Sequence, residues 1–426
     1  MSLDPTASRR EFLKHSTLTA GALVGSLAFA NRVYAADDDT IRLGLIGCGG
    51  RGSGAAVNAL RADPNVKLVA MADTFADQID ASHSAITKEM GDKAAERIDV
   101  PPERRFAGFD AFEKALEAVD VVILATPPHF RPAHLKAAVA AGKHCFVEKP
   151  IAVDAPGVRS VLATCDEAKE KRLSIVSGLC YRYDIAKRET YKRIFDGAIG
   201  DIVAMQVDYL ANTLKYFPRK AEWSDMEWQI RNWQYFTWLS GDHNVEQHIH
   251  SLDKAAWAMG DEPPLKCLGL GGRQMRDPKI GNTFDHFAVV YEYALGQKLF
   301  ARCRQMDGCT TEVNDYLIGA KGTCSVMKHQ IKGETQWTYK GPPPNMYQKE
   351  HDELFASIRS GNPINNGLYM CRSTMMAIMG RMSAYTGKEI TWDQALVSEE
   401  DLRPAQYQWG PAPEPVIAKP GITKFA

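Results

Sequence analysis

Short apolar runs alternate with segments of helical periodicity between residues 40 and 150. Such short runs favour strands that are buried on both faces of a parallel sheet. The runs lie at 41–46, 66–72, 119–125 and 143–147. Helices are predicted at 53–62 and 134–141. Because strands alternate with helices, the pattern predicts a doubly wound parallel sheet of the α/β class.

The pattern changes after residue 200, where predicted strands follow one another without intervening helices. These strands lie at 202–210, 264–270, 287–293, 298–305 and 316–326. Helices are predicted at 184–195, 347–360 and 369–385, and at 238–259, where the pattern allows an interruption. Successive strands favour a largely antiparallel sheet, so this part is expected to be a C-terminal α+β domain.

These patterns divide the chain into a leader at 1–35, a parallel-sheet domain at 40–155, an α+β domain at 156–410 and a proline-rich tail at 411–426. The formal charge is −1 over 426 residues, and no basic stripe suggests nucleic-acid binding. Nine cysteines are scattered without a C-x-x-C pair, so neither a disulfide framework nor a thiolate zinc site is expected.

The leader carries the paired residues Arg9 and Arg10, followed by a weakly apolar run at 16–30. This run is too short and too mild to span a membrane as a stable helix. Val33-Tyr34-Ala35 then offers small residues at the −3 and −1 positions of a cleavage site. The leader resembles a twin-arginine (Tat) signal peptide, which implies export of the folded protein by the Tat machinery, to the periplasm or otherwise out of the cytoplasm.

A glycine-rich segment, Gly47-Cys48-Gly49-Gly50-Arg51-Gly52, follows the first predicted strand with the spacing G-x-G-x-x-G. Its glycines permit a tight turn, a close approach of backbone to a pyrophosphate, and close packing of helix on strand. Asp73 ends the second strand, 21 residues after Gly52. A carboxylate there can accept both ribose hydroxyls and repels a 2′-phosphate. The segment therefore predicts a Rossmann domain that binds NAD, with NADP as the alternative.

Further loops are expected at the same crevice, since ligands bind at the carboxyl ends of parallel strands. They carry Ala125-Thr126-Pro127-Pro128 and Glu148-Lys149-Pro150. With His134 and Ala141-Gly142-Lys143-His144, these motifs make the chain after residue 40 resemble the Gfo/Idh/MocA family, which includes glucose–fructose oxidoreductase and inositol dehydrogenase. The cofactor-binding residues expected on this basis are Gly47, Gly49, Gly50, Arg51, Gly52, Asp73, Thr126, Pro127, His129, Glu148 and Lys149.

Lys149, Glu246 and His250 are the expected catalytic residues. The resemblance implies that Lys149 reaches the substrate hydroxyl, where an ammonium lowers the cost of deprotonation. Glu246 and His250 are four residues apart and would share a helical face, so the carboxylate can orient the imidazole and raise its basicity. The family pattern here is D-x-x-x-H, often with a glycine where His248 stands, so Glu246 replaces an aspartate and His250 is the implied acid/base. A metal bound by His243, His248, His250 and Glu246 is the alternative, but the chemistry does not need one, and none is expected.

Substrate contacts are expected from the second domain. Arg182 and Tyr183 lie where family members carry an arginine near cofactor or substrate; otherwise they brace the domain junction. Aromatic residues crowd into 228–238, where they form either core or a stacking wall for a sugar ring. The expected substrate-binding residues are Arg182, Tyr183, Trp233 and His248.

The function expected first is an exported NAD(P)-dependent oxidoreductase that acts on a hydroxyl of a sugar, sugar derivative or cyclitol. His250 would take the hydroxyl proton, Lys149 would polarise the oxygen, and hydride would pass to the nicotinamide. An exported enzyme lacks a supply of fresh NAD, so the cofactor is expected to stay bound. Two alternatives are an NAD-dependent glycoside hydrolase that works by transient oxidation and elimination, and a non-catalytic relative that binds NAD and sugar. A homo-oligomer is expected because family members commonly pair through the second sheet.

Overall fold

The computed structural model describes residues 39–343 and 345–426, and the expected signal peptide at 1–35 lies outside them. We call residues 40–177 the first domain and residues 178–426 the second domain, according to the sheets that they build. Within the described residues, no helix combines the length and the apolarity that a membrane span requires.

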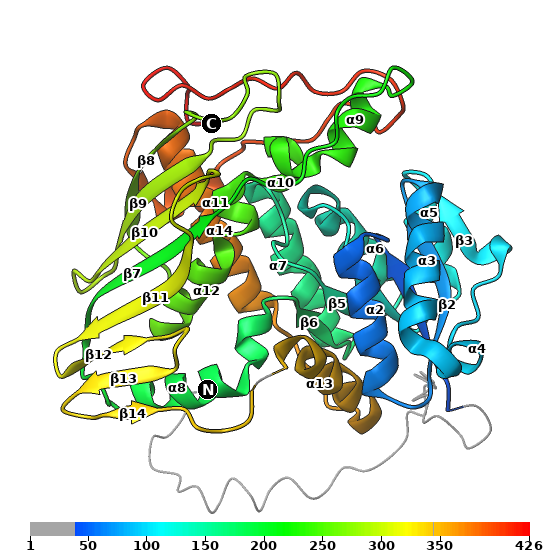
Figure 1. The fold of residues 1–426 in the computed structure, drawn as a ribbon, viewed down its shortest axis with the longest axis horizontal. Helices are drawn as coiled ribbons and strands as arrows, with labels where there is room; N and C mark the ends of the chain where they lie inside the picture. Colours follow the sequence, from blue (N-terminus) through cyan, green and yellow to red (C-terminus); the bar gives the residue numbers. More distant parts are fainter. Residues whose placement is uncertain (1–38, 344) are drawn as a thin grey trace, which may run out of the picture. The chain divides into compact units, whose positions relative to one another are not determined.

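The first domain is built on a parallel sheet with the strand order β3-β2-β1-β4-β5-β6 (Figure 1). Its central strands are almost wholly buried, because apolar side chains face both sides. The strands are β1 (Ile41–Ile46), β2 (Val66–Asp73), β3 (Arg105–Ala107), β4 (Val121–Leu124), β5 (His144–Val147) and β6 (Ile175–Ser177). The helices are α2 (Gly50–Ala62), α3 (Ala76–Met90), α4 (Ala94–Arg97), α5 (Ala111–Glu117), α6 (Arg131–Ala140) and α7 (Ala155–Glu170). The doubly wound parallel sheet predicted from the sequence is confirmed.

The first sheet extends beyond residue 155, where the sequence placed the domain boundary. Strand β6 pairs in parallel with β5 and adds a sixth strand to the sheet, after the crossover helix α7. The apolar pattern around this strand is equally compatible with either sheet, so only the pairing assigns it to the first domain.

The second domain carries a mixed, largely antiparallel sheet with the order β14-β13-β12-β11-β7-β10-β9-β8-β15. Only the β7–β10 pair among the described strands of this sheet is parallel. The strands are β7 (Ile202–Ala211), β8 (Lys266–Gly272), β9 (His286–Glu292), β10 (Lys298–Gln305), β11 (Glu312–Gly319), β12 (Gly322–Ser325), β13 (Gln330–Gly333), β14 (Trp337–Thr338) and β15 (Ile390–Thr391). Strands β9 and β10 alternate between buried and exposed residues, so one face of the sheet is covered and the other is open.

Helices cover the inner face of this sheet and join it to the first domain. α14 is buried along nearly its whole length and packs on β8 and on α7, and α13 packs on α2 (Figure 1). The helices of the second domain are α8 (Ile185–Phe195), α9 (Asp225–Arg231), α10 (Thr237–Ser240), α11 (His243–Glu246), α12 (Ile249–Ala258), α13 (Met346–Ser360), α14 (Gly367–Thr386) and α15 (Trp392–Val397).

The helix predicted at 238–259 is interrupted and becomes α10, α11 and α12. Gly241 and Asp242 both have positive φ angles, 76° and 78°, so the chain turns sharply between α10 and α11. The fully buried Asp242 accepts hydrogen bonds from the main-chain amides of His243 and Phe284 and from the hydroxyl of Tyr385. These bonds hold a left-handed conformation that costs energy for a residue other than glycine. A second interruption follows α11, so Glu246 ends α11 and His250 lies in the first turn of α12.

Candidate active site

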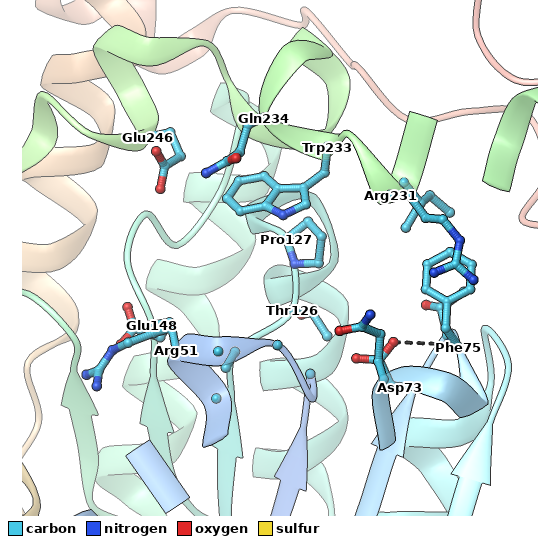
Figure 2. A pocket seen from close by; sticks show the side chains of 18 of the residues that line it. Arg51, Asp73, Phe75, Thr126, Pro127, Glu148, Arg231, Trp233, Gln234 and Glu246 are labelled. Carbon is cyan, nitrogen blue, oxygen red and sulfur yellow. Dashed lines mark hydrogen bonds and ion pairs between the residues drawn. The ribbon is translucent and has the colours of Figure 1, made fainter. Parts of the chain in front are cut away.

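A cavity of about 700 Å³ lies at the carboxyl ends of β1, β2, β4 and β5, where the second domain faces the parallel sheet (Figure 2). Both domains contribute side chains to its wall. The lining residues are Gly47, Gly49, Gly50, Arg51, Gly52, Asp73, Thr74, Phe75, Asp77, Gln78, Ala125, Thr126, Pro127, Arg131, Glu148, Lys149, Gly178, Cys180, Phe217, Lys220, Trp223, Ile230, Arg231, Trp233, Gln234, Glu246, His250 and Tyr347. The convergence of strand-end loops that the sequence predicted is therefore present.

Asp73 lies at one end of this cavity. Its carboxylate accepts hydrogen bonds from the main-chain amides of Cys48 at 2.7 Å and Phe75 at 3.0 Å, which fix its position beside the glycine loop. Burial raises the pKa of Asp73, while the amides of Phe75 and Cys48 act in the opposite direction. The carboxylate is thus held where a ribose can meet it.

Lys149 and Glu246 lie at the other end of the cavity and form an ion pair between the two domains. The Lys149 ammonium donates to the Glu246 carboxylate at 2.9 Å and to the Glu246 main-chain carbonyl at 2.6 Å. Both side chains are largely buried, at 13% and 12% exposed. An ammonium has three N–H donors. Among the described residues Glu246 takes two, so the third is available to a substrate oxygen.

The loops that carry Thr126 and Lys149 are tied together by Arg131. The buried guanidinium donates to the main-chain carbonyls of Thr126 and Pro150. The Lys149–Pro150 peptide bond is cis. Burial lowers the pKa of Arg131 to about 10, so it remains charged at neutral pH. The loop on which Lys149 lies is therefore fixed from within the first domain.

His250 contributes its imidazole to the cavity wall beside this pair. Its Nδ1 is buried and has no hydrogen-bond partner among the described residues. Burial lowers the pKa of His250 well below its usual range. The positive charges of Lys149, Lys254 and Arg51 lower it further. The imidazole is therefore neutral near pH 7 and can accept a proton.

The expected contact between Glu246 and His250 is not formed. The break after α11 removes the common helical face, and the Glu246 carboxylate bonds to Lys149 instead. The partner of His250 is the ring of Tyr181, which meets the imidazole edge-on with centroids 5.4 Å apart. Glu246 therefore orients the lysine and not the histidine.

Buried cations lie behind Tyr181. The Lys254 ammonium is 4.0 Å from the centre of the tyrosine ring, and that of Lys187 is 4.7 Å from it. Lys254 forms a fully buried ion pair with Asp315 at 2.7 Å. This arrangement places positive charge behind the ring that supports His250, and it favours the neutral imidazole.

Arg51 links the glycine loop to both domains. Its guanidinium forms ion pairs with Glu148, from the loop after β5, and with Glu350, from α13. Glu350 is fully buried, and burial raises its pKa well above the usual range, with the charge of Glu148 adding to the rise. Arg51 thus acts as a bridge between two acidic side chains at the edge of the cavity.

Comparison with known proteins identifies the first domain. Residues 41–176 match the GFO_IDH_MocA family, described as an oxidoreductase family with an NAD-binding Rossmann fold. This domain belongs to the Gfo/Idh/MocA family.

Known relatives extend the similarity into the second domain. The chain is 26% identical over 350 residues to inositol 2-dehydrogenase of Rhizobium meliloti (strain 1021). The alignment covers 77% of this chain and 93% of that protein. It is 23% identical over 352 residues to a glycosyl hydrolase family 109 protein of Shewanella pealeana, covering 76% and 69% of the two chains. The solved structure of aldose-aldose oxidoreductase from Caulobacter crescentus, complexed with glycerol, shares the fold, with a TM-score of 0.64, 17% identity and coverage of 83% and 99%.

The glycine loop of this Gfo/Idh/MocA domain fits the NAD that the family binds. A Cβ added at Gly52 would lie 2.0 Å from the carbonyl oxygen of Gly47, so only glycine permits the close packing of α2 on the loop. Gly49 and Gly50 face open space, and no side chain caps α2. Helix amides and an unobstructed backbone are what a pyrophosphate needs. The loop and Asp73 would hold the pyrophosphate and the ribose.

Four expected site residues lie outside the cavity, which corrects their predicted contacts. His129 was expected at the cofactor, but it is buried and its Nε2 lies 2.8 Å from the hydroxyl of Tyr407. His248, expected at the substrate, is fully buried and bonds to the Asn244 side chain. A histidine that follows α11 points into the domain core here, and spacing alone did not reveal its direction.

Arg182 and Tyr183 are the other two expected site residues that lie outside the cavity. The Arg182 guanidinium is enclosed by the carboxylates of Asp253 and Asp261, and the Tyr183 hydroxyl donates to Asn366. Both side chains are buried, and neither contributes to the cavity wall. The partners named here all lie in the second domain, so these contacts hold both side chains within that domain.

The aromatic segment at 228–238 divides into two parts. Trp233 lines the cavity and lies over Pro127 (Figure 2). Tyr235, Phe236 and Trp238 belong to a small core of their own.

Among the described residues, no three His, Cys, Asp or Glu side chains converge where a metal ion could be held.

The sequence did not reveal several residues of the wall. Phe75 follows Asp73 by two positions, and its place after a strand end was a signal that could have identified it. Arg231, Gln234 and Tyr347 come from a short helix, a 3₁₀ turn (Trp233–Tyr235) and the first turn of α13. Nothing in their local pattern indicates that these elements return to the parallel sheet.

Proposed function

We propose that this protein is an NAD-dependent oxidoreductase that acts on a hydroxyl of a sugar, a sugar derivative or a cyclitol. The observation that carries the proposal is that Lys149, Glu246 and His250 share the wall of one cavity. Glu246 lies across that cavity from Asp73 (Figure 2). A dinucleotide whose ribose lies at Asp73 leaves the Glu246 side for the reacting alcohol.

NAD, when bound, supplies the acceptor for the hydride that an alcohol carbon gives up. The residues of this chain bind the hydroxyl oxygen and accept its proton. Lys149 has one N–H donor left for the hydroxyl oxygen and stabilises negative charge there. His250 is neutral and can take the proton as general base. Glu246 holds Lys149 in place across the domain junction.

The wall around this triad suits a substrate with several hydroxyl groups. Trp233 offers an aromatic face for the C–H side of a ring, and Gln234 and Glu246 offer hydrogen bonds (Figure 2). One relative named above is an inositol 2-dehydrogenase, and the solved structure named above is that of an aldose-aldose oxidoreductase. Both names support a carbohydrate or cyclitol as the substrate class.

A second candidate function is an NAD-dependent glycoside hydrolase. It is favoured by the relatives that are glycosyl hydrolase family 109 proteins, of which one covers 76% of this chain. Transient oxidation of a sugar makes a neighbouring C–H more acidic, so elimination of an aglycone can follow. Water then adds to the double bond that elimination leaves, and the hydride is returned to the carbonyl. The same positioned lysine and neutral histidine serve both reactions.

One experiment separates these functions. The purified protein is examined for co-purified dinucleotide and then supplied with free sugars, cyclitols and aryl glycosides. Reduction of the bound cofactor by a free sugar or cyclitol supports the oxidoreductase, and aglycone release without net NADH supports the hydrolase. Bound NAD without either reaction supports a non-catalytic relative and contradicts the proposal.

Export by the Tat pathway is a further part of the proposal. It rests on Arg9, Arg10 and the weakly apolar run at 16–30. A folded passenger takes up NAD before transport and must keep it afterwards, so a second substrate would return the hydride. Replacing Arg9 and Arg10 by lysine in the full chain should abolish export. Unchanged export of that variant would contradict this route.

We also propose a homo-oligomer formed through the open face of the second sheet. Leu268, Val290 and Phe300 are 49%, 38% and 46% exposed. They are direct neighbours in the register of β8, β9 and β10 and form an apolar row. Contiguous exposed apolar surface of this kind often marks an interface.

A further inference from the structure

Two segments of the second domain meet at Phe75, at the Asp73 end of the cavity. The guanidinium of Arg231, at the end of α9, lies 3.9 Å from the centre of the Phe75 ring (Figure 2). The indole of Trp409 lies 5.6 Å from the same ring and 4.9 Å from that of Phe109. Phe75 itself donates its main-chain amide to Asp73. The second domain therefore reaches past the reacting end of the cavity to the end expected to hold adenosine.

Arg231 also forms ion pairs on both sides of the domain junction. It binds Asp77, in the first turn of α3, at 3.1 and 3.2 Å, and Glu227, on its own helix, at 2.9 Å. Its side chain is only 17% exposed. Two carboxylates already neutralise the guanidinium, so it is poorly suited to receive a 2′-phosphate. Its geometry suits a connection between α9 and the first domain.

The segment at 401–413, which we call the strap, makes a second connection. The hydroxyl of Tyr407 lies 2.8 Å from Nε2 of His129 in the first domain. The carbonyl of Gly410 accepts a hydrogen bond from the main-chain amide of Met226 in α9 at 3.0 Å. The strap thus spans from the loop after β4 to the helix that carries Arg231, and it brings Trp409 onto Phe75.

We infer that Arg231 and the strap form a latch that retains the adenosine half of the dinucleotide. The inference rests on the proposed function only in so far as an exported enzyme must keep its cofactor. Opening the cavity at Phe75 requires loss of the Arg231–Asp77 pair and separation of Phe75 from Arg231 and Trp409. The latch lies at the opposite end of the cavity from Lys149 and Glu246, so it governs cofactor release and not proton transfer.

The test measures release of NADH from the holoenzyme by stopped-flow fluorescence after mixing with excess NAD. Because each contact in the latch is individually modest, Arg231→Ala and Trp409→Ala should each accelerate release by about tenfold, and the double variant by more. Asp77→Asn removes the ion pair at an exposed side chain and keeps Arg231 on Phe75. It should therefore accelerate release by a smaller factor. Arg219→Ala is the control. Arg219 precedes α9 and pairs with Asp225 at the start of that helix, and it does not line the cavity.

Wild-type release rates in Arg231→Ala, Trp409→Ala and Asp77→Asn would overturn the latch. An increase in Arg219→Ala equal to that in Arg231→Ala would also overturn it, because a general loosening of α9 would then explain both. The measurement uses no sugar, so it is independent of turnover. Failure of the proposed function would appear as absent turnover with a normal release rate.

Discussion

The ammonium of Lys149 donates to both the carboxylate and the main-chain carbonyl of Glu246. Lys149 lies on the loop after β5 of the first domain, and Glu246 ends α11 of the second. The pair therefore forms only when the two domains are docked. The reacting end of the cavity depends on tertiary packing as much as on the residues themselves.

Replacing Lys149 by methionine should lower kcat/KM by about 10²- to 10³-fold, the usual cost of removing one donor that stabilises developing negative charge. Bound dinucleotide should persist, because the glycine loop and Asp73 are unchanged. Steady-state kinetics and measurement of co-purified dinucleotide test both points. Lys171→Met, at an exposed position of the first domain, should behave as wild type. A Lys149→Met enzyme with wild-type kcat/KM would remove Lys149 from the mechanism.

The pH dependence of kcat/KM should report His250. Its pKa lies well below the usual 6.5, so the base is neutral and active above that lowered pKa, and activity is lost as the pH falls through it. The acid limb of the wild-type profile is therefore expected below pH 6.5. In His250→Asn this limb should disappear from the residual activity. An acid limb at or above pH 6.5, or one that persists in the variant, would assign the base to another group.

Gly52→Ala should disrupt the glycine loop, because the added Cβ would lie 2.0 Å from the Gly47 carbonyl oxygen. We expect reduced stability and loss of bound dinucleotide. Gly54 lies on the same helix and faces open space, so Gly54→Ala should stabilise the protein by about 0.5–1 kcal/mol. Thermal unfolding and dinucleotide content of the two variants provide the comparison. Equal behaviour would show that the close approach at Gly52 is unimportant.

Phe300→Glu should dissociate the proposed oligomer, since it places a charge within the apolar row on the second sheet, next to Val290. Leu295, in the turn before β10, is 88% exposed and lies outside that row, so Leu295→Glu should keep the wild-type assembly. Light scattering coupled to size-exclusion chromatography measures both. A wild-type monomer, or an unchanged assembly in Phe300→Glu, would contradict the interface.

The first domain was predictable because its signals are local. Apolar runs buried on both faces, glycines at fixed spacing and a carboxylate at a strand end each depend on neighbouring residues. The expected positions of Gly47, Asp73 and Lys149 around one cavity followed from the rule that parallel strands end at the same edge. The sixth strand fell outside the predicted first domain, because the short run Ile175–Ser177 does not show which sheet it pairs with.

The second half of the site was less predictable. Glu246 and His250 were identified, but their relationship was not, because α11 ends at Glu246 and α12 begins only at Ile249, a break that the helical pattern does not locate. His248 is equally close in sequence and faces the core. Helical spacing predicts a shared face only while the helix continues.

The sequence by itself determined the parallel sheet, the dinucleotide-binding loop and the residue types available for chemistry, because period and spacing are properties of neighbouring positions. Only the tertiary structure decided that Glu246 pairs with Lys149, that Arg182 pairs with Asp253 and Asp261, and that Arg231 reaches Phe75. These contacts join residues that are far apart in the chain. Their formation depends on how buried faces pack and where buried charges find partners, which no local pattern records.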